Sequence, residues 1–321
     1  MPFFSVVMPI YNKGPHIGRA IRSVLNQSFE DFELILVNDA STDNSLEEIE
    51  KVVDPRIRLF HREVPGPGGY AARNLGIREA YAEWVAFLDA DDEWYPQHLE
   101  EYLKIISKFP AVGMLSCGYR IEDRSYGDVN PYFKQYHQFG DHIIPKRVFL
   151  EQFAKNSFIQ FTSCSCIKRS LLEAIGGFPD GIVTKAGDIY TWIMCALNTD
   201  VIAWSAHLGA IYHQDSENMV TKTNYPSPDS LMSLTSRLLD ASPEEYKKLL
   251  KRIHNRRIIT EYKRAIVVPG KRFEIARFLF FSVNPIGFLL WSIIDLIVNF
   301  FPQRWISNLN LMRKMIRGLR T

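Results

Sequence analysis

The sequence lacks the features of a secreted protein stabilised by disulfides. Its 321 residues include only four cysteines, too few for a disulfide scaffold: Cys117, Cys164, Cys166 and Cys195. Cys164 and Cys166 lie too close for easy bridging, and no second Cys/His pair lies near them, which argues against zinc there. The first residues, MPFFSVVMPIYN, show no basic stretch followed by a long apolar run. We therefore expect no secretory signal and a reduced, cytosolic compartment.

Internal repeats, low-complexity tracts and the glycine fingerprint of a dinucleotide-binding enzyme are missing as well. A GxGxxG sequence should follow the first strand of a Rossmann dehydrogenase, but Gly14 and Gly18 have the wrong spacing. The composition excludes disorder, because 46% of the residues are hydrophobic and 23% are charged. The length suits one large domain or two moderate ones.

The formal net charge is small, but it combines two regions of opposite sign. Residues 1–240 hold 22 Lys and Arg against 31 Asp and Glu, a net of −9, and residues 241–321 hold 16 against 5, a net of +11. An acidic body and a basic tail predict different partners for the two regions. The basic tail carries no recognised nucleic-acid-binding motif, so we expect no nucleic-acid partner.

Strand-like and helix-like segments alternate through the first 121 residues. Short runs rich in β-branched and aromatic residues predict strands at 5–9, 33–39, 57–62, 83–89 and 112–121. Apolar residues at helical spacing predict helices over 17–25 and 99–106. A cap at Asp43 predicts a helix that runs through Glu50, and residues 71–81 predict another. This alternation predicts an α/β fold with a Rossmann-like, mostly parallel central sheet flanked by helices. Ligands of such sheets bind beyond the carboxyl ends of the strands.

The second half of the chain shows weaker periodicity. Residues 122–160 predict loops and short helices, followed by a strand at 164–167 and helices at 170–175 and 188–197. After Pro226 and Pro228 the pattern becomes helical and basic.

Four polar segments stand at strand ends or at the start of a helix in the same layer. They are PIYN (9–12), NDASTD (38–43), ARNLG (72–76) and DADDEW (89–94). Each alone is more typical of a turn or a helix cap. In this order and at these spacings they resemble family 2 of the glycosyltransferases, with its GT-A nucleotide-sugar-binding fold, over roughly residues 3–215. The resemblance implies a GT-A domain over 1–225, with a nucleotide-binding half (1–121) and an acceptor half (122–225), before a helical, basic region (226–321).

The DADDEW segment carries residues suited to a divalent cation. Asp89 and Asp91 are two residues apart at a strand end, so an extended backbone aims both the same way. Their hard oxygen atoms suit Mg²⁺ or Mn²⁺, which neutralises a diphosphate leaving group as a Lewis acid. The resemblance implies that Asp91 is the metal ligand and that Asp89 lies near the ribose and the metal. Asp92 either positions the acceptor or starts a helix, and His213, in AIYH (210–213), either completes the metal shell or is structural.

The nucleotide is expected at the ends of the first two strands. A carboxylate at Asp39 can accept a hydrogen bond from the N3–H of uracil or thymine, a donor that cytosine lacks. The resemblance places the base here against the loop of Pro9, Tyr11 and Asn12, with Tyr11 available to stack. Arg73 reaches toward the nucleotide or its phosphates, or forms a surface salt bridge. Glycines in the preceding segment, Gly66, Gly68 and Gly69, predict a loop that closes over the donor.

A catalytic base is expected in the second half. The GGFPD segment (176–180), followed by Gly187 and Asp188, resembles the acceptor side of the family, where the final Asp is the general base. The family's usual Glu before that Asp is Gly187 here, a departure from the pattern. Asp188 is alternatively the N-cap of the helix that follows, and the two roles can coexist. Trp192, one turn later, lines the acceptor pocket or packs in the core.

The basic tail contains a long apolar run. Residues 278–301 hold one charge in 24 positions, a length that can span a bilayer. Pro285 interrupts the run, however, and Ser292, Asp295 and Asn299 recur on one helical face, which favours a helix lying in the membrane interface. A spanning helix and a buried or oligomerising hairpin remain alternatives. Basic residues follow without an acid, as expected beside anionic lipid: Arg304, Arg313, Lys314, Arg317 and Arg320.

Together these features predict an inverting, metal-dependent, hexosyltransferase-like enzyme at the cytoplasmic face of the membrane. The expected donor is a UDP-sugar, and the expected acceptor is a lipid-linked saccharide of a surface polysaccharide or lipopolysaccharide pathway. Association with the membrane is peripheral or monotopic, and a homo-oligomer is possible. The alternative is a non-catalytic nucleotide-sugar-binding or scaffold protein held at the membrane by its tail. The acidic motif and Asp188 favour the enzyme, whereas Gly187 favours the alternative.

Overall fold

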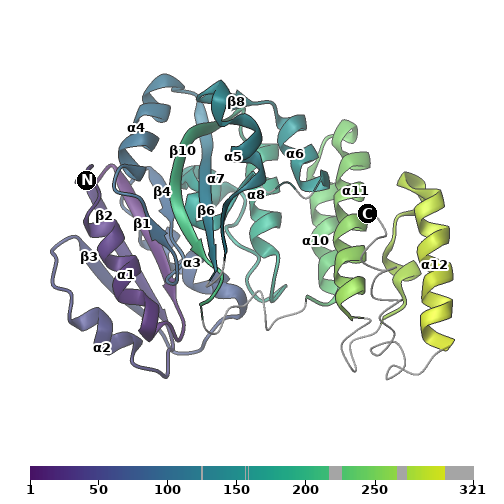
Figure 1. Cartoon of the computed structure of the whole chain (residues 1–321), viewed down its shortest axis with the longest axis horizontal. Helices are drawn as coiled ribbons and strands as arrows, with labels where there is room; N and C mark the ends of the chain where they lie inside the picture. Colours follow the sequence, from purple (N-terminus) through teal and green to yellow (C-terminus); the bar gives the residue numbers. More distant parts are fainter. Residues whose placement is uncertain (124–125, 156, 158, 217–225, 266–272, 301–321) are drawn as a thin grey trace. The chain divides into compact units, whose positions relative to one another are not determined.

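The computed structural model describes residues 1–123, 126–155, 157, 159–216, 226–265 and 273–300 (Figure 1). The chain divides into two compact units, Met1–Asn224 and Tyr225–Thr321. Each unit is described by itself below.

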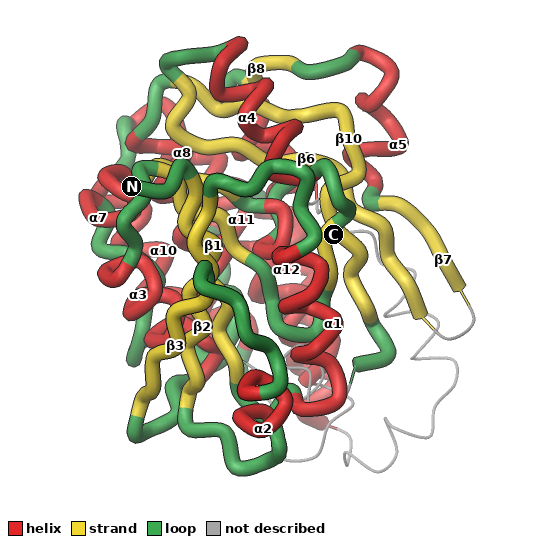
Figure 2. The backbone as a smooth tube through the Cα atoms, turned by 90° about the vertical axis from the view of Figure 1, so that its left-hand side faces the viewer, coloured by secondary structure: helices red, strands yellow, loops and turns green. Residues whose placement is uncertain are grey.

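The first four predicted strands form the parallel half of the sheet, in the order β3-β2-β1-β4. Its strands are β1 (Phe4–Ile10), β2 (Phe32–Asp39), β3 (Ile57–Arg62) and β4 (Trp84–Phe87). All eight residues of β2 are buried, because helices cover both faces of a parallel sheet and its central strands are therefore apolar throughout. Figure 2 shows β1, β2 and β3 side by side. The predicted parallel sheet is confirmed for these strands.

Three helices connect these strands and cover the half-sheet. They are α1 (Gly14–Leu25), α2 (Ser45–Glu50) and α3 (Tyr70–Glu79). The buried stripe of α1, which includes Ile17, Ile21 and Val24, joins the core with Val6 and Met8 of β1. Val7 points to the other face of β1, where it contacts α3. The parallel strands therefore end together at one edge of the sheet.

The second half of the sheet continues in the order β4-β9-β6-β10-β5 and is mixed in direction. The strand predicted at 164–167 is β9, which pairs antiparallel with both β4 and β6. The long strand β10 runs parallel to β6 and was not predicted, because serine, histidine and glycine interrupt its apolar pattern. The strands are β5 (Glu93–Trp94), β6 (Val112–Asp123), β7 (Tyr126–Val129), β8 (His142–Ile144), β9 (Cys166–Lys168) and β10 (Val201–His213).

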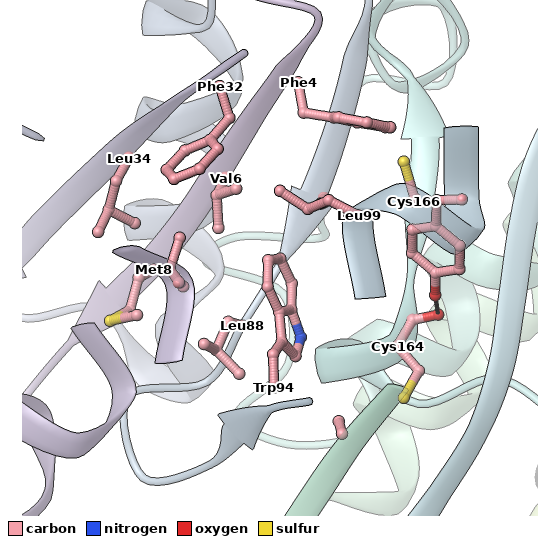
Figure 3. Close-up of a cluster of buried hydrophobic side chains, with 14 of the residues drawn as sticks. Phe4, Val6, Met8, Phe32, Leu34, Leu88, Trp94, Leu99, Cys164 and Cys166 are labelled. Atoms are coloured by element: carbon pink, nitrogen blue, oxygen red, sulfur yellow. Dashed lines mark hydrogen bonds between the residues drawn. The ribbon is translucent and has the colours of Figure 1, made fainter. Parts of the chain in front are cut away.

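Helices complete the first unit. They are α4 (His98–Lys108), α5 (Pro131–Tyr136), α6 (Lys146–Lys155), α7 (Arg169–Ala174) and α8 (Gly187–Asn198), with short 3₁₀ turns η1 (Pro67–Gly69), η2 (His137–Phe139) and η3 (Thr162–Cys164). A core cluster lies between β1, β2, α1 and α4 and includes Phe4, Met8, Phe32, Trp94 and Leu99 (Figure 3). Replacing one such side chain by Ala lowers the unfolding free energy by about 2–5 kcal/mol. This cluster therefore stabilises the packing of the helices against the sheet.

The second unit is helical, as its sequence predicts. It contains α10 (Pro228–Ala241), α11 (Glu244–Ala265) and α12 (Pro285–Phe300), with turns η4 (Ile275–Phe278) and η5 (Phe281–Val283). Asp295 of α12 is buried and accepts hydrogen bonds from the Tyr262 hydroxyl (2.6 Å) and the Ile275 amide (3.2 Å). The face that carries Asp295 therefore packs within the unit.

The α-helix formed by the apolar run at 278–301 is shorter than the run itself, because α12 covers only Pro285–Phe300. Pro285 begins α12 rather than interrupting a longer helix, since proline is tolerated in a first helical turn. Among the described helices, none combines the length and the apolar character needed to cross a membrane. The basic residues predicted to follow the run, 304–320, lie outside the described residues.

Candidate active site

A cleft of about 530 Å³ opens at the carboxyl ends of β1, β2 and β4. This is the position in which open α/β sheets bind their ligands. Eight predicted site residues line it: Pro9, Tyr11, Asn12, Asp39, Arg73, Asp89, Asp91 and Asp188. They come from five separate segments of the first unit, which the fold brings to one place.

The loop after β1 is tied to the loop after β2. Asn12 has a left-handed φ of 52°. Its side-chain Oδ1 accepts a hydrogen bond from the Thr42 backbone amide at 2.8 Å, and its backbone amide donates to the Ser41 hydroxyl at 3.1 Å. Asparagine tolerates this backbone conformation better than most residues do. Tyr11 precedes it and is 47% exposed. The two loops together therefore hold an accessible aromatic ring at the rim of the cleft.

Asp39 ends β2 and is almost fully buried. It accepts hydrogen bonds from the Arg62 guanidinium and from the Gly66 amide (3.0 Å). Burial raises the pKa of Asp39, although the Gly66 amide and the Arg62 charge oppose this rise. The carboxylate thus fixes the glycine-rich segment against the end of β2.

Asp89 and Asp91 lie on the loop after β4, and each is paired with a cation. Arg73 Nη2 lies 2.5 Å from Asp89 Oδ1, and Lys13 Nζ lies 2.7 Å from Asp91 Oδ2. Burial raises the pKa of Asp89, the Arg73 charge opposes the rise, and the charges of Asp91 and Asp188 add to it. Both carboxylates reach the cleft. Their hard oxygen atoms fit a divalent cation such as Mg²⁺ or Mn²⁺.

Arg73 connects this acidic pair to the glycine-rich loop. It is 7% exposed, donates to the Gly68 carbonyl at 2.9 Å and lies over the Phe178 ring, with 5.5 Å between its Cζ and the ring centroid. The alternative of an exposed surface salt bridge is therefore wrong.

Asp188 lies in the first turn of α8 and lines the cleft. The helix begins at Gly187 with Ala186 at the N-cap position, in a left-handed conformation with φ 70°. Asp188 is therefore not the N-cap, and that alternative is wrong. A carboxylate in the first turn of a helix is stabilised by the positive end of the helix dipole.

The structure explains why glycine precedes Asp188. The Gly187 amide donates to the Tyr70 hydroxyl at 2.8 Å. A Cβ atom at this position would lie 2.7 Å from Pro179 Cγ and 2.8 Å from Tyr70 Cζ. The close approach of Tyr70 thus leaves no room for the glutamate expected there.

Three predicted residues are not among the described residues that line the cleft. Asp92 is buried and accepts hydrogen bonds from the Ser163 hydroxyl (2.5 Å) and the His213 amide (3.2 Å). It does not line the cleft, and it does not start a helix, because α4 begins at His98. Burial, reinforced by the charges of Asp91 and Asp89, raises the pKa of Asp92 well above its usual value.

The other two such residues, Trp192 and His213, are also buried. Trp192 packs against Phe87 and Phe178, with ring centroids 6.2 and 5.5 Å apart, so it belongs to the core. His213 Nε2 lies 3.5 Å from Glu93 Oε1. Its side chain is thus directed to β5, which does not support a place in the metal shell.

Sequence reasoning missed several residues that line the cleft, chiefly Lys13, Tyr70, Lys185 and Tyr212. Lys13 directly follows the PIYN segment, and Lys185 stands three residues before Asp188. Lysines next to motifs built for a diphosphate were a usable signal, because a phosphate site needs cations.

Three kinds of similarity accompany this geometry. The model of the family described as Glycosyl transferase family 2 matches residues 5–176. An uncharacterised glycosyltransferase of Haemophilus influenzae is 40% identical over 108 residues, which is 33% of this chain and 43% of that protein. The putative teichuronic acid biosynthesis glycosyltransferase TuaG of Bacillus subtilis is 39% identical over 108 residues, 33% of this chain and 42% of that protein. The chain thus spans less than half the length of these curated relatives.

Solved structures resemble the fold over nearly the whole chain. Residues 1–349 of TarS from S. aureus, in complex with UDP-GlcNAc, have a TM-score of 0.66 at 18% identity, with 99% of this chain and 92% of that chain covered. The mannosyltransferase PcManGT from Pyrobaculum calidifontis, in complex with GDP-Man and Mn²⁺, has a TM-score of 0.53 at 19% identity, with 96% and 88% covered. At these identities the likeness concerns the fold, and it confirms the predicted GT-A class.

Proposed function

The chain belongs to glycosyl transferase family 2, and from this premise we propose that it moves a sugar from a UDP-sugar to a hydroxyl group of a lipid-linked saccharide, with inversion at the sugar C1. The observation that carries the proposal is that Asp39, Asp91 and Asp188 line one cleft. Transfer requires that the nucleobase is recognised, the diphosphate is neutralised and the acceptor hydroxyl loses its proton within one site.

The base of the donor is assigned to Asp39 and Tyr11. Each carboxylate oxygen of Asp39 accepts one hydrogen bond, from Arg62 or Gly66, and keeps a further lone pair for the N3–H of uracil. Tyr11 is exposed at the rim and can stack on the base. The complex of the similar TarS structure with UDP-GlcNAc supports a uridine nucleotide.

The diphosphate is assigned to the cleft floor. Asp89 and Asp91 would hold Mg²⁺ or Mn²⁺, which neutralises the leaving group when it is bound. Lys13 and Arg73, now paired with these carboxylates at 2.7 and 2.5 Å, are then available to the phosphate oxygens. Lys185 lines the same cleft and adds a further positive charge.

Asp188 is assigned the role of general base. Its carboxylate accepts the proton of the acceptor hydroxyl as that oxygen attacks C1 and the bond from C1 to the diphosphate breaks. The resulting direct displacement inverts the configuration at C1. The position of Asp188 at the cleft, in a helix turn that it does not cap, supports this role.

The acceptor is assigned to a membrane surface because of α12. Five apolar residues on one side of this helix are exposed by 43–81%: Ile286, Leu289, Leu290, Ile293 and Leu296. The polar Asp295 faces inward, so the outward side of the helix is apolar, as in helices that lie in the lipid interface. The net charge of +11 in residues 241–321 favours anionic lipid. The names of TuaG and of the putative colanic acid biosynthesis transferase WcaA of Escherichia coli support a surface polysaccharide as product.

Nucleotide release from a panel of UDP-, dTDP- and GDP-sugars, with and without Mn²⁺, tests the proposal. We expect release from a UDP-sugar only, dependent on Mn²⁺ and accelerated by a membrane extract that supplies the acceptor. Asp91→Asn should abolish most of the release, and Asp54→Asn, in a surface pair with Arg56, is the matched control. Binding of UDP without hydrolysis or transfer of any sugar would instead support the non-catalytic alternative. Full turnover of Asp91→Asn in a chelator would contradict the metal assignment.

A further inference from the structure

Outside the cleft, two histidines and a cysteine from distant parts of the chain meet at one point. They are His98, the first residue of α4, Cys117 of β6 and His207 of β10. His98 Nδ1 lies 3.1 Å from His207 Nε2 and 3.9 Å from Cys117 Sγ. Among the described residues, this is the group of three possible ligands whose donor atoms all lie within 4.8 Å of one another.

The local backbone is irregular where this cluster forms. Two of the three register shifts between β6 and β10 lie here, between Ser205 and Leu208 and between Leu208 and Ala210. Such bulges redirect a side chain out of the regular alternation of a strand, and here they flank His207.

A glycine gives the cluster its space. A Cβ atom on Gly209 would lie 2.2 Å from His98 Nδ1 and 2.4 Å from Cys117 Sγ. Only glycine therefore lets β10 approach the two donor atoms. The bulges and this glycine are separate features of β10, and both favour the same cluster.

The surroundings orient the three side chains. His207 Nδ1 lies 2.8 Å from the hydroxyl oxygen of Ser205, which is fully buried. A proton on Nδ1 that is donated to Ser205 leaves the Nε2 lone pair directed at the cluster. The rings of Trp94 and Tyr102 pack on His98 at 4.5 and 4.2 Å between centroids. His98 and Cys117 are almost fully buried, and His207 is half-buried, which leaves one side of the cluster accessible.

We propose that His98 Nδ1, Cys117 Sγ and His207 Nε2 bind a zinc ion, with a water molecule as fourth ligand on the side of His207. Bonds of about 2.3 Å to sulfur and 2.0–2.1 Å to nitrogen give tetrahedral N···N and N···S separations of about 3.4 and 3.6 Å. The observed 3.1 and 3.9 Å each differ from these by about 0.3 Å. Small side-chain rotations would therefore bring both of these pairs to zinc-binding separations, and all three donor atoms already lie within 4.8 Å of one another. A set of two imidazoles and one thiolate suits zinc better than Mg²⁺ or Ca²⁺.

The site is separate from the cation expected in the cleft, since its three ligands are not among the described cleft residues. It joins the start of α4 and the neighbouring strand β6 to β10, which lies far along the chain from both. The ion therefore stabilises the second half of the sheet rather than taking part in transfer. This inference does not rest on the proposed function.

Metal content and cobalt spectroscopy test the site on the full chain. Protein from zinc-supplemented cells, dialysed against metal-free buffer, should retain one zinc per chain by mass spectrometry. The Asp91→Asn variant should retain the same zinc, because that substitution removes only the cation of the cleft. After exchange with Co²⁺, the protein should show the near-ultraviolet charge-transfer band of a thiolate bound to cobalt. A chelator should lower the melting temperature of the unmodified protein.

Variants of the ligands and a matched cysteine complete the experiment. Cys117→Ser and His207→Gln should each lose the zinc and the cobalt band, whereas Cys195→Ser, at another buried thiol, should keep both. Should Cys117→Ser fail to fold, His207→Gln and the cobalt spectrum of the unmodified protein still decide. A zinc-free protein, zinc that is lost only in Asp91→Asn, or a cobalt spectrum without the thiolate band would each overturn the site.

Discussion

A conservative substitution of Asp188 separates its proposed role as general base from any structural role. Asp188→Asn keeps the size and hydrogen-bonding capacity of the side chain but removes its ability to accept a proton. We expect kcat for transfer to fall by ~10²-fold or more, the usual effect of losing a positioned base. The affinity for UDP should stay within about twofold of that of the unmodified protein, because the general base Asp188 is assigned to the acceptor side and not to the nucleotide. Transfer kinetics and calorimetric titration with UDP measure the two quantities.

Asp200 offers the matched control for this change. It also lies in the acceptor half, is exposed and does not line the cleft, so Asp200→Asn should leave both quantities unchanged. Equal turnover of Asp188→Asn and the unmodified enzyme would show that Asp188 is not the base.

Asp92 gives a pH-dependent prediction at the same scale. Its pKa in the folded state is raised, first by burial and then by Asp91 and Asp89, so the folded state holds the proton more tightly than the unfolded chain does. The contribution of Asp92 to stability is therefore full below its unfolded pKa of about 3.9 and is lost as the pH rises through the folded value. Asp92→Asn should gain stability relative to the unmodified protein as the pH rises from 4 to 8. Melting temperatures of both proteins in chelator measure this difference, and a constant difference would contradict the raised pKa.

Among the elements, those with strong periodicity were predicted well. The buried strands β1, β2 and β3 and the amphipathic α1 appear within one residue of the predicted positions or extend them at one end. Their apolar residues either fill both faces of a parallel strand or follow one helical stripe, and both patterns are visible in a single sequence. The motifs at the strand ends then indicated most of the cleft.

The elements that were missed owe their structure to distant contacts. β10 contains His207, Gly209 and His213, whose places depend on bulges and on packing against α4, β5 and β6. Asp92 and Trp192 belong to chemically suitable motifs, yet Ser163 and Phe178 hold them in the interior. Burial of this kind depends on residues far away along the chain, so sequence pattern cannot distinguish it from a functional position.

The junction before α8 yields a prediction about an element. Gly187→Ala places a methyl group 2.7 Å from Pro179 and 2.8 Å from the Tyr70 ring, so either Tyr70 or the first turn of α8 must move. Overpacking of this kind costs about 1–3 kcal/mol of unfolding free energy, and we also expect a loss of transfer because Asp188 moves with the turn. Gly127→Ala, whose Cβ would meet only the end of Arg120 at 3.2 Å, is the control that should be neutral. Denaturant unfolding of both variants measures the change in unfolding free energy. An unfolding free energy of Gly187→Ala equal to that of the unmodified protein would contradict the close packing at this junction.

At the scale of the whole molecule, α12 carries the proposed contact with the membrane. Its outward residues, including Leu289 and Ile293, are apolar and more than 50% exposed, and such a surface is stable in water only when it is small or covered. Replacing both by Ser removes this apolar contact without touching the buried Asp295. We expect the double variant to lose most of its binding to vesicles of anionic lipid, measured by sedimentation, while it still binds UDP. Activity should fall on a lipid-linked acceptor in membranes and survive on a water-soluble one.

The control for this variant is a pair of apolar residues elsewhere that are even more exposed, Val53 and Val64, which are 95% and 68% exposed in the first unit. Changing both to Ser should leave vesicle binding intact. High salt should release the unmodified protein only in part, because it screens the basic residues of the tail but leaves the apolar contact in place. If the Leu289/Ile293 variant binds vesicles as well as the unmodified protein but changes from an oligomer to a monomer, the apolar face covers a second copy of the chain. The membrane assignment would then be wrong, because the same side chains cannot lie in lipid and in a protein interface at once.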